Sequence, residues 1–129
     1  MKHLSAPESP FEPADPRNFV GKAQVRRLPL VGGPEPVVVY LVEFEPGART
    51  NWHRHSAPQL LLVTEGIGVV QKWGEPKRTI AAGEAVCIEP DEKHWHGAGP
   101  STKMSHFAVN LNLTTEWMEP VTDDQYRAS

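Results

Sequence analysis

Residues 47–66 read GARTNWHRHSAPQLLLVTEG, and this stretch does most to decide how the chain can fold. Two histidines, His53 and His55, stand two positions apart within it. Because successive side chains of a β-strand point to opposite faces, these two imidazoles share one face. Gln59 begins the next apolar run, with the parity that places its amide beside them. The stretch therefore predicts two strands that present nitrogen and oxygen ligands together.

Two more histidines repeat this spacing further along, since residues 94–96 read His-Trp-His. If this segment is extended, His94 and His96 share a face, and His106 lies in a further predicted strand. Imidazole is a common ligand of Zn, Cu, Fe, Ni and Mn. Histidines this far apart in the chain can meet at one ion only when the sheet closes around them. The pattern therefore predicts a divalent metal site inside a folded barrel.

The rest of the chain has the pattern of short strands separated by turn residues. We expect strands over residues 24–30, 37–45, 51–55, 59–65, 66–73, 77–81, 85–89 and 103–113, with turns at 32–34 and 74–76. Near the end, Thr122 and Gln125 have the spacing of a capping box, which predicts one short helix. Strands this close together, without helical crossovers, favour an antiparallel all-β barrel or sandwich.

The length of the chain suits one domain, because 129 residues are too few for two ordinary ones. Prolines at positions 7, 10, 13 and 16 oppose regular structure at the start. We therefore expect residues 1–18 to form a proline-rich arm, either disordered or packed on a neighbouring subunit. The single folded domain is then residues 19–129.

The composition excludes several kinds of partner. A net charge of -3 with scattered basic residues gives no footprint for nucleic acid or anionic lipid. No apolar run approaches the roughly 20 residues that span a bilayer. Cys87 is the only cysteine, so we expect a reducing, cytoplasmic location. A small-molecule substrate is the remaining expectation, and exposed sheet edges favour a homodimer or homotetramer.

Two segments resemble the paired motifs of the cupin family. Residues 47–66 are similar to the first motif, with Gln59 where the family usually has Glu. Residues 83–94 are similar to the second motif and keep its spacing from Gly83 to His94, although Asp91 replaces the usual glycine. The resemblance implies an all-β cupin fold, the double-stranded β-helix or jelly-roll barrel, here with a short C-terminal helix.

Three further segments are similar to bacterial, manganese-dependent cupin hydroxynitrile lyases: FEPGART at 44–50, EKHWHG at 92–97 and WMEPVT at 117–122. By this resemblance the chain binds one divalent metal, with Mn first and Fe, Zn or Ni as alternatives. The implied metal ligands are His53, His55, Gln59 and His94. The same resemblance places His96 and His106 in the active cavity.

The neutral ligand set favours Lewis-acid chemistry over oxidation, because three imidazoles and an amide cancel none of the positive charge of the metal. Cleaving a hydroxynitrile (cyanohydrin) needs a base for the hydroxyl proton and an acid for cyanide. His106 is the expected base, with His96 next, since histidine titrates near neutral pH. The expected walls of the substrate pocket are Tyr40, Val42, Ala108 and Asn110.

Two other functions stay open at this point. The first is a cupin oxidoreductase of the dioxygenase type, which the amide of Gln59 disfavours. The second is a non-catalytic cupin that binds a metal or a small molecule. The fold cannot choose among these functions, because one barrel can support many chemistries.

Overall fold

The structure is a computed structural model that describes residue 1 and residues 3–31 and 36–128. It is built almost entirely of strands, as predicted, and the turn expected at 32–34 lies outside the described residues. In chain order the elements are η1 (Ala6–Glu8), β1 (Glu12–Pro13), β2 (Phe19–Val20), β3 (Ala23–Val31), β4 (Val37–Phe44), β5 (Arg49–Thr50), β6 (His53–His55), β7 (Gln59–Lys72), β8 (Arg78–Ala81), β9 (Ala85–Ile88), β10 (His94–Ala98), β11 (Met104–Leu111), β12 (Thr115–Trp117) and α1 (Asp123–Arg127).

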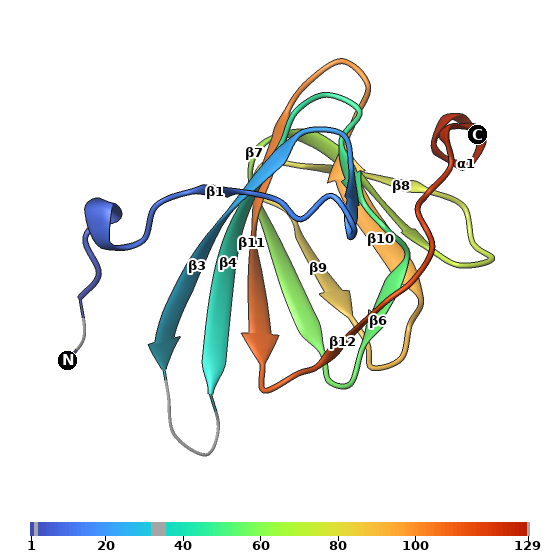
Figure 1. The fold of residues 1–129 in the computed structure, drawn as a ribbon. Coiled ribbons are helices and arrows are strands. Elements are labelled where there is room, and N and C mark those ends of the chain that lie inside the picture. Colours follow the sequence, from blue (N-terminus) through green and yellow to red (C-terminus); the bar gives the residue numbers. More distant parts are fainter. Residues whose placement is uncertain (2, 32–35, 129) are drawn as a thin grey trace.

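The strands form one curled antiparallel sheet, in which β7 is the central member (Figure 1). The main path runs β1-β3-β4-β11-β7-β10-β5-β2. The first half of β7 pairs with β11 and β9, and its second half pairs with β10 and β8. One strand therefore belongs to both walls of the curl, and the side chains on the inner face of each wall point toward a shared interior.

The predicted break of β7 at residue 66 is wrong, because the strand continues through Gly66. This glycine has a φ of 78°, a backbone conformation that other residues rarely adopt. A Cβ at this position would collide with the carbonyl oxygen of Lys103 at the start of β11. The glycine thus bends β7 and lets the neighbouring strand β11 approach closely, and it does not end β7.

The predicted strand over 51–55 is also wrong in part, since only residues 53–55 form a strand, β6, and residues 51–52 interrupt the chain between β5 and β6. The backbone N–H of Asn51 donates to the carbonyl of Asn18, and that of Trp52 donates to the carbonyl of Glu119. The interruption therefore attaches segments from both ends of the chain to the barrel. The strands β1, β2 and β12 were missed because two or three residues carry no visible alternation.

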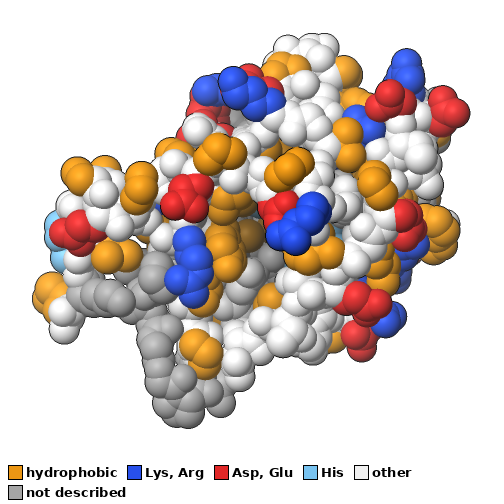
Figure 2. Space-filling view, viewed as in Figure 1, with side chains coloured by type: hydrophobic (Ala, Val, Ile, Leu, Met, Phe, Trp, Pro, Cys, Tyr) orange, Lys and Arg blue, Asp and Glu red, His pale blue; other side chains and the backbone are white. Residues whose placement is uncertain are grey.

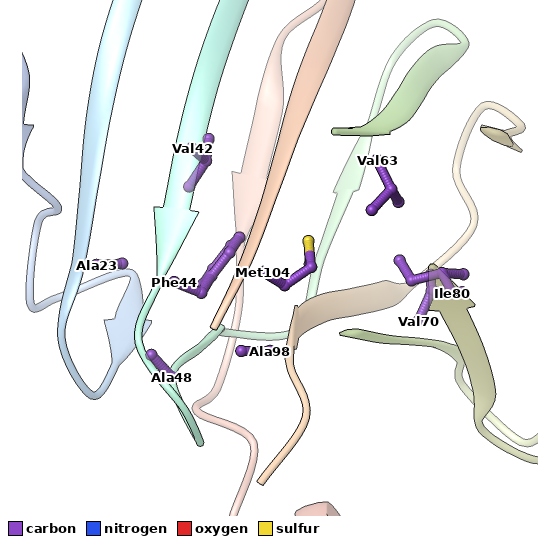
Figure 3. Packing of buried hydrophobic residues seen from close by; sticks show 9 residues of the cluster. All are labelled: Ala23, Val42, Phe44, Ala48, Val63, Val70, Ile80, Ala98 and Met104. Carbon is purple, nitrogen blue, oxygen red and sulfur yellow. The ribbon is translucent and has the colours of Figure 1, made fainter. Parts of the chain in front are cut away.

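Apolar side chains from several strands pack inside the curl (Figure 3). This cluster consists of Ala23, Val42, Phe44, Ala48, Val63, Val70, Ile80, Ala98 and Met104. A second cluster, of Trp52, Trp95 and Val121, packs beneath the C-terminal segment. A third cluster consists of Leu61, Ile88 and Ala108, so buried polar groups share the interior with apolar packing.

Both ends of the chain pack against the barrel. In the N-terminal arm, Glu12 of β1 pairs with Val25 of β3. At the other end, α1 begins with the predicted capping box, in which Thr122 and Gln125 bond to each other's backbone. Among the described residues, no helix is long and apolar enough to cross a membrane.

Candidate metal centre

Five buried histidines from three strands meet in the interior of the curl. His53 and His55 come from β6, His94 and His96 from β10, and His106 from β11. The predicted alternation accounts for each pair, and the register of the sheet brings the pairs together, because His94 lies opposite His53. The ring centroids of His53 and His94 are 4.2 Å apart, and that of His55 is 5.1 Å from His94.

Backbone carbonyls orient two of these rings. The Nδ1 atom of His53 lies 2.8 Å from the carbonyl oxygen of Asn51, and that of His94 lies 2.8 Å from the carbonyl oxygen of Glu92. A carbonyl only accepts hydrogen bonds, so each Nδ1 carries the proton and each Nε2 keeps a lone pair. This is the arrangement that metal-binding histidines commonly have.

Two of the remaining three rings, those of His96 and His106, are bonded to each other. The Nε2 atom of His106 lies 2.9 Å from the Nδ1 atom of His96. The remaining nitrogens, Nδ1 of His106 and Nε2 of His96, have no hydrogen-bond partner among the described residues. The two rings share one proton along their bond, and each has a free nitrogen at its far side.

Burial keeps these imidazoles neutral. Desolvation lowers the pKa of His106 to about 4, and lowers the pKa of His55 to about 4 with help from neighbouring His94. The same cause, reinforced by nearby imidazoles, lowers the pKa values of His53 and His96 well below the ordinary value. Burial also lowers the pKa of His94. Neutral imidazole is the form that binds metal ions.

The polar atoms left without partners fit a cation. Among the candidate ligands outside the His96–His106 pair, Nε2 of His94, Nδ1 of His55 and Oε1 of Gln59 are buried and unbonded among the described residues. A buried polar atom without a partner costs free energy, and a bound ion would satisfy several at once. One nitrogen from each of His53, His94 and His96 lies within 4.8 Å of the others, so this triad could hold a metal.

The triad differs from the three predicted histidine ligands in one residue. The compact triad includes His96 where the resemblance implied His55, whose ring centroid is 5.0 Å from that of His53. Gln59 lies at the start of β7 and is buried with the histidines. Of the predicted ligands, His53, His55 and Gln59 line one cavity and His94 lies beside the two histidines, while His96 is a further candidate.

A cavity of about 360 Å³ opens beside the histidines. The four predicted wall residues line it, as do four of the five histidines, while His94 does not. The sequence analysis missed two further residues of the cavity wall, Phe19 of the two-residue strand β2 and Trp117 of the three-residue strand β12. The centroids of their rings lie 5.9 Å apart. On the face shown in Figure 2, hydrophobic side chains gather in a hollow with charged groups around it.

A curled antiparallel sheet that gathers neutral imidazoles beside one cavity defines a small β-barrel whose interior could hold a metal. The family model described as "Cupin domain" matches residues 40–109. The chain therefore belongs to the cupin family, which confirms the resemblance and the fold inferred from it.

Individual relatives add detail to this assignment. The chain is 45% identical to an (R)-mandelonitrile lyase of Granulicella tundricola, over 98% of each chain. It is 38% identical over 81 residues to a dimethylsulfoniopropionate lyase of Ruegeria pomeroyi, which covers 60% of this chain and 53% of that one. A crystal structure of a cupin-like protein from Thermotoga maritima superimposes with a TM-score of 0.85 at 38% identity, covering 89% of this chain and 90% of that one.

Proposed function

We propose that this cupin is a metal-dependent lyase that cleaves or forms a small hydroxynitrile. The observation that carries the proposal is the set of buried, neutral histidines with free lone pairs at the wall of a cavity. The near full-length similarity to a protein named (R)-mandelonitrile lyase supports the choice of reaction. The cavity has the size range of small-molecule sites.

The proposed metal ligands are His53, His55, Gln59 and His94, with Mn²⁺ as the first candidate and Fe, Zn or Ni as alternatives. A divalent metal bound there supplies Lewis acidity, which stabilises negative charge on a substrate oxygen. His55 is preferred over His96 as a ligand because, in this proposal, the Nδ1 atom of His96 accepts a hydrogen bond from His106. The Nε2 atom of His96 then carries the proton and has no lone pair for a metal.

In the proposed reaction, the pair His106–His96 carries a proton from one side of the substrate to the other. The free Nδ1 of His106 accepts the hydroxyl proton of the hydroxynitrile. The proton on its Nε2 passes to Nδ1 of His96 along their 2.9 Å bond, and His96 releases its own Nε2 proton to the departing cyanide. The carbon–carbon bond breaks as the carbonyl forms, giving an aldehyde and hydrogen cyanide.

The other cavity walls would bind the organic part of the substrate. Tyr40, Val42 and Ala108 line the cavity from β4 and β11, on the face that His106 shares. Trp117 lies against the ring of His53, with centroids 4.7 Å apart. Aromatic and aliphatic walls of this kind favour a substrate with an apolar or aromatic substituent.

Elemental analysis of the purified protein, joined to a cyanide-release assay on mandelonitrile, tests the proposal. We expect about one equivalent of divalent metal per chain and cyanide release that stops after chelation and returns with Mn²⁺. Metal-loaded protein that releases no cyanide would overturn the lyase assignment. Oxygen consumption with a diketone or flavonol panel would then indicate a dioxygenase, and melting shifts without turnover would indicate a binding protein.

We also propose that the protein acts as a cytoplasmic homodimer or homotetramer. The outward-facing side chains of β7 and β11 include exposed apolar groups, among them Leu60, Leu62 and Leu111. Apolar groups gathered on one sheet face are typical of an association surface. Light scattering of the purified protein measures the assembly, and a monomer at working concentration would contradict this part of the proposal.

A further inference from the structure

The amide of Gln59 has one hydrogen-bonded end and one free end. Its Nε2 atom donates to Oδ1 of Asn110 at 2.7 Å. Its Oε1 atom is buried and has no partner among the described residues. The two residues lie directly opposite each other in the register of β7 and β11, so the sheet itself holds the side chains within reach.

The orientation of this amide matters because its two ends carry opposite partial charges. A cation binds the oxygen of an amide and is repelled by the NH₂ group. The oxygen and nitrogen have nearly the same size, and the terminal torsion of glutamine is broad, so packing cannot choose between the two orientations. Only a hydrogen bond can choose, and an acceptor facing the NH₂ group selects the orientation that leaves the oxygen free.

We propose that Asn110 is a positioning residue that holds the NH₂ group of Gln59 away from the metal and so presents Oε1 as a ligand. This inference rests on the proposed metal site and deepens it, by naming the residue that determines the orientation of its one oxygen ligand. It also gives Asn110 a role besides that of cavity wall. A glutamate at position 59 would have no NH₂ group to donate, so Gln59 and Asn110 form a matched pair.

The affinity for Mn²⁺ tests the inference without any activity assay, since free Mn²⁺ can be counted by its EPR signal. Asn110→Leu keeps the volume of the side chain and removes the acceptor. We expect it to weaken Mn²⁺ binding about 10- to 100-fold, the usual range for residues that orient a metal ligand. Val38→Ala is the matched control, because Val38 lies opposite Asn110 on β4, lines the same cavity and offers no acceptor.

A double-mutant cycle separates an effect through Gln59 from a general disturbance of the barrel. In a Gln59→Ala background, Asn110→Leu should leave Mn²⁺ affinity unchanged, because no amide remains to orient. Asn110→Asp keeps an acceptor and should retain wild-type affinity or exceed it. The negative charge of the aspartate can itself change Mn²⁺ affinity. That contribution is measured as the effect of Asn110→Asp in the Gln59→Ala background.

The outcomes distinguish this inference from the proposed function. Wild-type protein that binds no Mn²⁺ overturns the metal site and this inference with it. Wild-type binding that is weakened by Gln59→Ala but not by Asn110→Leu overturns the positioning role alone. If circular dichroism shows that Asn110→Leu is unfolded, Asn110→Ser carries the same prediction, since its hydroxyl is too short to reach the amide.

Discussion

Two pairs of histidines line the same interior, but the protein holds their rings in different ways. His53 and His94 each bond through Nδ1 to a backbone carbonyl, so their protons are fixed and their Nε2 lone pairs point away from the backbone. His96 and His106 bond to each other instead, so their shared proton can reside on either ring. A fixed tautomer suits a metal ligand, whereas a shared proton suits transfer. The hydrogen-bond partner thus separates two roles within one residue type.

Removing a ligand should have the largest effect. His53→Ala, His94→Ala or His55→Ala should release most of the metal, because each removes one of the four proposed ligands. His96→Ala is the matched control, since this ring is equally buried on the same face and should leave the metal bound. Elemental analysis measures the content. If His55→Ala kept a full equivalent and His96→Ala lost it, the two residues would exchange roles.

Removing the proposed base should have the next largest effect, and only on the rate. His106→Ala should bind Mn²⁺ as the wild type does, yet release cyanide from mandelonitrile about 10²- to 10⁴-fold more slowly, the usual contribution of a general base. The assay is run on protein of measured metal content. Wild-type turnover by this variant would remove His106 from the mechanism.

Acid should weaken the metal-free fold. The pKa values of His55 and His106 are lowered by burial from 6.5 to about 4, so the unfolded chain binds more protons between these values. Stability is therefore greatest above pH 6.5 and falls as the pH is lowered toward 4. Thermal melts of chelated protein across this range should show the decline.

The variant His106→Phe provides the comparison for this pH series, because it removes one of the two groups. It should show a shallower decline than the wild type over the same range. A melting temperature that stayed level from pH 6.5 to 4 in the wild type would mean that these rings are not held neutral by burial.

The smallest effect is expected far from both pairs. Thr122→Ala removes the side-chain acceptor at the start of α1 and should lower the free energy of unfolding by about 1 kcal/mol, as measured by urea denaturation. Metal content and cyanide release should not change. A loss of either would show that general destabilisation also reaches the histidines, and would weaken the interpretation of the other variants.

Local features of the sequence predicted much of this molecule. The spacing of Thr122 and Gln125 predicted the capped helix. The alternation of side chains along a strand predicted that the two histidines of each His-x-His pair share a face. The predicted break at Gly66 was wrong because a glycine can also serve a close approach between strands, and a single position does not reveal which. The interruption at Asn51 was missed because its partners, Asn18 and Glu119, lie far away in the chain.

The sequence by itself determined the residue types, their spacing and therefore the faces on which they lie, since these follow from the two-residue period of a strand. Only the tertiary structure decided which strands are neighbours and in what register. Pairing His94 with His53, and Asn110 with Gln59, depends on contacts between distant segments, whose energies no local pattern contains. The same pairing buries each imidazole in the interior, and that burial, absent from the sequence pattern, keeps the rings neutral.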